Sequence, residues 1–192
     1  GAHELGVRNV IALTGDPPSV GPYSQATGVW DTDSIGFIRI LKTLNEGVDW
    51  AGNSIGTPTD FFVAAAANPA HEDLELEIER CRRKLEAGAD VIMTQFVWDV
   101  KQLTSFFDRV GPVRVPILAG VLPLQSSRHA EFMHNEVPGV FIPDDLRDRM
   151  RKAGENGIRE GLAIAKDFLA EIREFVQGIA AQVGLPAQRV LL

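Results

Sequence analysis

Cysteine is nearly absent from this 192-residue sequence, because Cys81 is its only cysteine. A single cysteine excludes an internal disulfide framework and a cysteine-rich zinc site. The sequence also lacks an apolar run of about 20 residues, the length that a membrane-spanning helix needs. Its first ten residues do not have the pattern of a signal peptide. We therefore expect a cytoplasmic protein with no membrane partner.

Basic clusters are missing as well. The sequence holds 19 Lys and Arg against 26 Asp and Glu, which gives a net charge of −7. An acidic chain without a basic run argues against nucleic acids and anionic membranes as partners. Apolar residues make up 45% of the sequence and charged residues 23%, as in globular proteins that are large enough to bury a core.

What the sequence does contain is an alternation of short apolar runs and longer amphipathic segments, the pattern of βαβ units. Glycine, proline and helix-capping residues mark the ends of these segments. The apolar runs predict parallel strands buried on both faces, at residues 10–13, 61–67, 91–95, 115–121 and 176–181. The amphipathic segments predict helices at residues 34–47, 75–87, 100–110, 128–136, 144–152 and 156–175.

Two details of this prediction concern the last third of the chain. The long helix at 156–175 has apolar side chains at helical spacing, which predict its buried face: Ile158, Leu162, Ala165, Leu169 and Ile172. Residues 184–192 fit the first turn of a further helix.

The number of units limits the architecture. A βα unit takes roughly 30 residues and a complete eight-unit barrel about 250, so the chain is two or three units too short for a complete barrel. Five units fit either a doubly wound open sheet or part of a (β/α) barrel. In both architectures the chemistry gathers where strands end in loops, on the carboxyl side of the sheet.

Polar residues occur at these strand ends. Asp16 follows the first predicted strand in TGDPP, and either a functional carboxylate or a turn aspartate bonded to its own backbone fits there. Gln95 closes an apolar strand, and its amide can form paired hydrogen bonds with a heterocycle. The other strand ends read Asn68-Pro69 and Gly120-Val121-Leu122-Pro123, and Thr94 precedes Gln95.

Several other motifs do not predict a catalytic or metal site. The segment GNSIG at 52–56 matches a nucleophile elbow, but that motif needs a strand before it and a helix after it, so we interpret it as a loop. No G-x-G-x-x-G or P-loop is present. His71, His129 and His134 have no metal-binding spacing, and we predict no metal site.

Lys84 stands out within a basic helical run. Arg80, Arg82, Arg83 and Lys84 lie beside acidic residues, which indicates a mainly solvated face. A helix packed on a barrel can, however, direct one cation at a cofactor phosphate, and Lys84 is our candidate for that role.

Six motifs then occur in an order that resembles the methylenetetrahydrofolate reductase family. They are TGDPP from Thr14, DTDSIG from Asp31, Asn68-Pro69, EAGA from Glu86, TQF from Thr94 and AGVLPL from Ala119. The segments at 48–56 and 130–137 resemble the branch in which the reductase is fused to a homocysteine methyltransferase. The resemblance extends from about residue 3 to residue 180.

The resemblance implies a TIM-type (β/α)8 barrel, of which residues 1–192 are the C-terminal part with about the fourth to eighth βα units. It implies FAD-dependent reduction of 5,10-methylenetetrahydrofolate to 5-methyltetrahydrofolate by NADH or NADPH. In such an enzyme the flavin carries the chemistry, and the protein orients and tunes it. We also expect a homo-oligomer or a fusion to a homocysteine methyltransferase domain.

Site residues follow from the resemblance position by position. Asp16 and Gln95 match catalytic positions, and Gln95 is also expected to bind the pterin. The positions expected to bind FAD are Thr14, Gly15, Asp16, Ala66, Asn68, Glu77, Lys84 and Met93. His129 and Met133 fall where related enzymes bind substrate through other residue types.

The first three barrel strands, including the strand that ends in the family's glutamate general acid, are not found in the sequence. We therefore expect the chain to be part of a longer polypeptide and to be inactive alone. Two other functions stay open: a non-catalytic truncated barrel that associates with a methyltransferase domain, and a flavin reductase of another substrate.

Overall fold

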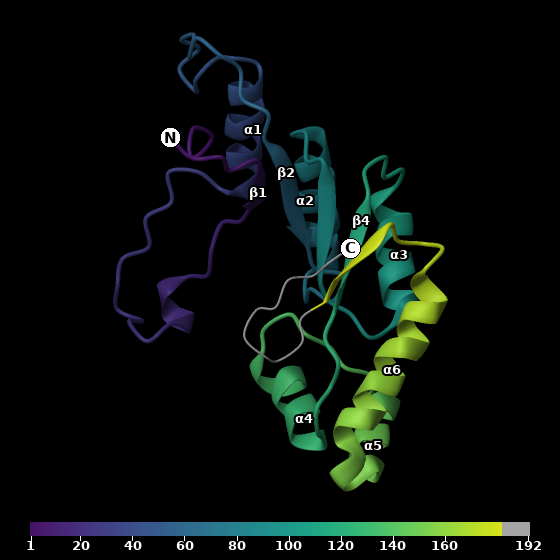
Figure 1. Ribbon diagram of the computed structural model, residues 1–192. Helices are drawn as coiled ribbons and strands as arrows, with labels where there is room; N and C mark the ends of the chain where they lie inside the picture. The colour runs from purple at the N-terminus through teal and green to yellow at the C-terminus, as the bar shows by residue number, and fades with distance from the viewer. Residues whose placement is uncertain (182–192) are drawn as a thin grey trace. The chain divides into compact units, whose positions relative to one another are not determined.

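The computed structural model describes residues 1–181, and the predicted helix turn at 184–192 lies outside them. The chain forms two compact units. The first contains residues 1–66 and 82–91, and the second contains residues 67–81 and those from 92 onward. Both are built from strands and helices that alternate along the chain (Figure 1).

In the first unit two parallel strands pack with one helix. Strand β1 (Asn9–Ala12) pairs with β2 (Phe62–Ala67), with Asn9 opposite Phe62 and Ala12 opposite Ala65. A short 3-10 helix, η1 (Pro18–Val20), interrupts the loop that leads to α1 (Ser34–Asn45). The carboxylate of Asp33 accepts a hydrogen bond from the Gly36 N–H at 2.8 Å, which caps α1.

An ion pair ties α1 to the sheet of the first unit. The ammonium of Lys42 lies 2.6 Å from a carboxylate oxygen of Asp90. The same carboxylate accepts a hydrogen bond from the Val63 N–H at 2.7 Å. Asp90 therefore links the last part of α1 to the start of β2.

Strand β1 is not buried on both faces, which corrects the prediction for this strand. Ile11 is 50% exposed and Leu13 is 58% exposed, and Phe62 on β2 is 46% exposed. Within the described first unit, β1 hydrogen-bonds to β2 alone. The apolar composition of a strand sets its preference for burial, whereas its actual burial depends on what packs against it.

In the second unit three parallel strands follow chain order. Strand β4 (Ile117–Val121) pairs with β3 (Val91–Phe96) on one side and with β5 (Gly178–Ala181) on the other. Its helices are α3 (Val100–Val110), α4 (Ser127–Glu136), α5 (Asp144–Ala153) and α6 (Gly157–Ile172), and a 3-10 turn, η2 (Gly154–Asn156), precedes α6. Helix α2 (Leu74–Glu86) contributes its first residues to the second unit and its last residues to the first. The α/β class and the parallel strands are thus as predicted.

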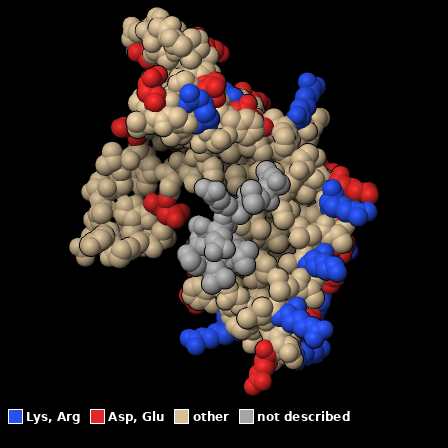
Figure 2. All heavy atoms as spheres, in the orientation of Figure 1, with Lys and Arg blue, Asp and Glu red and all other residues tan. Residues whose placement is uncertain are grey.

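The core of the second unit lies between the loop after β4 and the last helices. Trp98, Leu124, Met133, Ile142 and Met150 are among its buried members. Arg147 on α5 pairs with Glu131 on α4 at 2.8 Å, and Arg149 pairs with Glu160 on α6 at 2.8 Å. Further Lys and Arg side chains lie over α5 and α6 on the face drawn in Figure 2.

Helix α6 buries Ala165 and Ile172 as predicted, but its buried face is rotated away from the first part of the predicted one. Ile158 is 66% exposed and Leu162 is 53% exposed, whereas the buried residues are Gly157, Gly161, Ile164, Ala165, Phe168 and Ile172. A Cβ atom built on Gly161 would lie 1.7 Å from the Leu124 carbonyl oxygen. The helix therefore approaches the loop after β4 through its glycines, and a pattern of large apolar residues does not reveal such a contact.

Candidate functional site

At the end of β1, Thr14 connects the strand to the helix that follows it. Its hydroxyl accepts a hydrogen bond from the Ser34 N–H at 3.0 Å, at the first turn of α1. Gly15 has φ +83°, a backbone conformation that favours glycine. Asp16 is exposed and makes no hydrogen bond within the described first unit. Its carboxylate is thus not bonded to its own turn, and it is open to a ligand.

Lys84 on α2 is buried, unlike the neighbouring Arg82 and Arg83. Lys84 is only 6% exposed, and its ammonium donates a hydrogen bond to the Ala66 carbonyl oxygen at 2.7 Å. The structure agrees with the expectation that Lys84 differs from a solvated charge. Ala66 lies one residue before the end of β2, so this cation is held at the carboxyl end of a strand.

At the end of β2, Asn68 and Glu77 are engaged by the backbone of the second unit. The Asn68 N–H donates to the Glu77 carboxylate at 3.0 Å, and Glu77 is 4% exposed. The Asn68 side chain accepts from the Ala70 N–H and donates to the Gly139 carbonyl oxygen, both at 3.0 Å. The amide of Asn68 therefore holds two loops together, and its predicted contact with FAD stays a prediction.

The end of β3 contains an irregularity in the strand pairing. Met93 lies opposite Leu118 and Phe96 lies opposite Gly120, so that three steps along β3 match two along β4. A bulge of this kind redirects side chains and is frequent beside active sites. It falls on Thr94 and Gln95, the residues at this strand end that the sequence singles out.

Gln95 is half-buried at this bulge. Its side-chain oxygen accepts a hydrogen bond from the Phe96 N–H at 3.0 Å. Within the described residues its side-chain NH₂ makes no hydrogen bond, so two donor hydrogens are available at the strand end. Met93, the other predicted residue of β3, is also half-buried.

Predicted substrate residues lie on α4. The hydroxyl of Ser126 accepts from the His129 N–H at 3.1 Å, and His129 Nδ1 accepts from the Gln125 N–H at 3.2 Å. Burial lowers the pKa of His129, because desolvation disfavours the imidazolium. Met133 is 7% exposed and belongs to the core cluster. Their contacts with substrate stay predictions.

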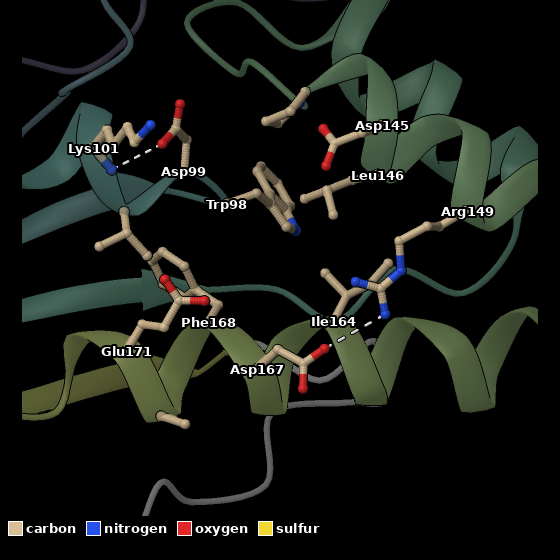
Figure 3. A pocket seen from close by; sticks show the side chains of 13 residues that line it. Trp98, Asp99, Lys101, Asp145, Leu146, Arg149, Ile164, Asp167, Phe168 and Glu171 are labelled. Atoms are coloured by element: carbon tan, nitrogen blue, oxygen red, sulfur yellow. Dashed lines mark hydrogen bonds and ion pairs between the residues drawn. The ribbon is translucent and has the colours of Figure 1, made fainter.

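A groove of about 700 Å³ in the second unit was not predicted from the sequence. The side chains of Trp98, Leu146, Ile164 and Phe168 line it, and Arg149 reaches toward Asp167 across it (Figure 3). None of the predicted site residues lines this groove. Its walls come from the start of α3 with the residues before it and from the consecutive helices α5 and α6 later in the chain, so no local motif signals it.

We place the candidate site at the strand ends rather than in the groove. In the first unit the strand ends hold the buried ammonium of Lys84 and the open carboxylate of Asp16, and in the second unit β3 ends at the half-buried amide of Gln95. Groups of each kind orient polar ligands. The groove is lined by charged side chains as well as by Trp98, but two of its polar groups are already paired. The Trp98 indole N–H donates to the Leu122 carbonyl oxygen at 3.2 Å, and Arg149 forms ion pairs with Glu160 and Asp167.

The remaining motifs are accounted for by local structure. The GNSIG segment is a loop, as predicted. Asp49 accepts hydrogen bonds from the Asn53 and Ala51 N–H groups, and the bond from Asn53 lowers the pKa of its carboxyl. Within residues 1–181 no helix is long and apolar enough to cross a membrane, and no cluster of His, Cys, Asp or Glu is arranged to hold a metal.

Parallel strands that alternate with helices define an α/β protein. The model of the methylenetetrahydrofolate reductase family matches residues 1–180 of the chain. The chain therefore belongs to the methylenetetrahydrofolate reductase family.

Two curated relatives illustrate the match. Methylenetetrahydrofolate reductase 1 of Schizosaccharomyces pombe is 28% identical over 83% of this chain and 25% of its own length. The 5,10-methylenetetrahydrofolate reductase of Escherichia coli is 27% identical over 72% of this chain and 42% of its own length. The chain thus spans a quarter to less than a half of the length of these relatives.

A solved structure shares the fold. A protein from Clostridium thermocellum, which binds two copies of 5-methyl-5,6,7,8-tetrahydrofolic acid, superposes with a TM-score of 0.52. It is 22% identical, and the match covers 66% of this chain and 48% of that protein.

Proposed function

We propose that the intact protein containing this chain reduces 5,10-methylenetetrahydrofolate to 5-methyltetrahydrofolate with NADH or NADPH, through a bound FAD. Membership of the family supports the reaction, and the names of both relatives state it. The names of plant relatives from Arabidopsis thaliana and Zea mays include NADH. The Clostridium thermocellum neighbour binds the proposed product.

The observation that carries the proposal is the buried ammonium of Lys84 at the carboxyl end of β2. Placing a cation in a buried position is costly unless it has partners. Lys84 is 6% exposed, and its partners include the Ala66 carbonyl oxygen. A strand-end ammonium suits a cofactor phosphate, because charge-assisted hydrogen bonds are stronger than neutral ones. The donor chemistry at this strand end of the first unit, where Lys84 and Ala66 lie together, therefore fits a phosphate of FAD.

When bound, the flavin supplies the hydride transfer between nicotinamide and folate. The chain's own residues orient the reactants. Gln95 donates hydrogen bonds from its NH₂ group to the folate. Asp16, exposed at the end of β1, contributes a negative charge that stabilises cationic forms of the folate.

Replacing Lys84 tests whether the chain binds FAD as proposed. In the intact protein, Lys84→Met keeps an unbranched side chain and removes the charge. We expect FAD affinity to fall by about 1.5–3 kcal/mol, the range for a hydrogen bond to a charged group. Titration of the apoprotein with FAD, followed by flavin absorbance, measures the loss.

Arg83→Met is the matched control, since it removes a neighbouring exposed charge from the same helix. It should leave FAD affinity unchanged. Equal affinities for the Lys84→Met variant and the unmutated protein would remove Lys84 from the site. If the unmutated protein does not bind FAD at micromolar concentration, a non-catalytic barrel becomes the better account.

A further inference from the structure

A buried hydroxyl bridges the two strands at the bulge. Thr94 is 8% exposed. Its hydroxyl oxygen accepts a hydrogen bond from the Gly120 N–H on β4 at 2.8 Å, and the hydroxyl donates to the Gln95 carbonyl oxygen at 2.8 Å. A single side chain thus satisfies two backbone groups that the regular ladder leaves unpaired at a bulge.

Gly120 provides the space for this arrangement. A Cβ atom at this position would lie 2.6 Å from the Thr94 carbonyl oxygen and 2.7 Å from that of Gln95. The Gly120 carbonyl oxygen accepts a hydrogen bond from the Val97 N–H at 3.0 Å, so strand pairing resumes directly after the bulge. A glycine inside a strand commonly marks such a close approach of two backbones.

The bulge also determines which end of the Gln95 amide is available. A backbone N–H can only donate, so the contact with Phe96 requires the oxygen of the Gln95 amide. One of the two acceptor sites of the oxygen is therefore used locally, whereas both N–H donors of the amide stay available. The residue thus presents more donor than acceptor capacity to a ligand.

We propose that Thr94 and Gly120 are positioning residues for Gln95, and that this strand end recognises a hydrogen-bond acceptor on the pterin, a carbonyl oxygen or an unprotonated ring nitrogen. The inference rests on the proposed folate substrate. Without the hydroxyl, the Gly120 N–H and the Gln95 carbonyl lose their partner in a buried place, which favours a different backbone path. The Gln95 amide then leaves the position in which its donors meet the ligand.

Four variants of the intact protein test this inference. Thr94→Val removes the hydroxyl at constant shape, and Thr94→Ser restores it. Gln95→Glu keeps the oxygen for the Phe96 N–H but removes the donors. Thr104→Val is the matched control, because Thr104 is a half-buried threonine whose hydroxyl bonds within α3, to the Val100 carbonyl oxygen.

Two measurements are made on each variant: hydrogen exchange of the β4 amides and calorimetric affinity for 5-methyltetrahydrofolate. We expect Thr94→Val to accelerate exchange at Gly120 and to weaken folate binding about tenfold, the scale of one net hydrogen bond. Thr94→Ser should stay within about twofold of the unmutated protein, Thr104→Val should match it, and Gln95→Glu should lose at least as much affinity as Thr94→Val.

Each contrary outcome contradicts one part of the proposal. If Thr94→Val binds folate normally while Gln95→Glu does not, the positioning role is wrong and the folate site stands. If Gln95→Glu binds normally, the donor assignment is wrong. If the unmutated protein binds no 5-methyltetrahydrofolate, the proposed function and this inference both fail. If Thr94→Val does not fold, two measurements on the unmutated protein test the inference instead. Rapid hydrogen exchange at the Gly120 amide would overturn it, and so would a Gln95 side-chain ¹⁵N resonance that does not shift when folate is added.

Discussion

Several polar residues that the sequence singles out as ligand-binding make hydrogen bonds to backbone atoms of their own unit. Thr14 is bonded to Ser34, Asn68 to Gly139 and His129 to Gln125. The sequence predicts that polar side chains occur at strand ends and helix starts. It does not predict their partners, because a contact such as Asn68 to Gly139 joins residues 71 positions apart.

His129 gives a prediction that depends on pH. Its folded-state pKa lies below the unfolded value of about 6.5, so the unfolded chain binds more protons between the two values. The stability from neutral His129 is complete above about pH 6.5 and is lost as the pH falls toward the folded pKa. His129→Asn keeps an acceptor for the Gln125 N–H and cannot titrate.

As the pH falls from 7.5 to about 5, we therefore expect the melting temperature of the unmutated protein to fall more than that of His129→Asn. Carboxyl groups titrate in both proteins and cancel in this comparison. A difference that is constant with pH, or an NMR titration of the His129 ring at or above 6.5, would contradict the assignment.

At the scale of elements, local signals predict most boundaries. Helix α3 begins and ends where the sequence places it, because Asp99 caps its start and Gly111 follows its end. The bulge in β3 is not predictable from β3 alone, since the register depends on the strand that pairs with it. The first half of the buried face of α6 is misassigned for a related reason: its contact with the Leu124 carbonyl requires glycine rather than a large apolar residue.

Gly161→Ala tests this packing of α6. Alanine is the better helix former by about 1 kcal/mol, so without the contact the substitution would stabilise the helix. We expect instead a loss of about 1–3 kcal/mol in the free energy of unfolding, because the added methyl group collides with the backbone at Leu124. Urea unfolding of the intact protein measures it.

Leu162→Ala is the control on the neighbouring exposed position. It removes more side-chain atoms than Gly161→Ala adds, yet we expect it to cost less than about 1 kcal/mol, because this position is open to solvent. A Gly161→Ala protein that is more stable than the unmutated one would show that α6 does not lie against this loop.

At the scale of the whole molecule, composition and alternation predict an α/β protein with parallel strands, and the ordered motifs identify its family. The exposure of Ile11 on β1 and of Leu13 directly after it was not predictable, because burial of a strand is a property of its surroundings. The groove between α3, α5 and α6 was also not predictable, because three separate helices form it.

The central claim is that Gln95, at the end of β3, orients the folate in a flavin-dependent reductase. Anaerobic stopped-flow spectroscopy of the intact protein tests it most directly, because it separates flavin reduction by NADH or NADPH from flavin reoxidation by 5,10-methylenetetrahydrofolate. We predict that both half-reactions occur, and that Gln95→Glu slows the folate half-reaction about 10- to 100-fold, with a smaller effect on the nicotinamide half-reaction. Equal losses in the two half-reactions together with a lower melting temperature, or a reduced flavin that the folate does not reoxidise, would contradict the account.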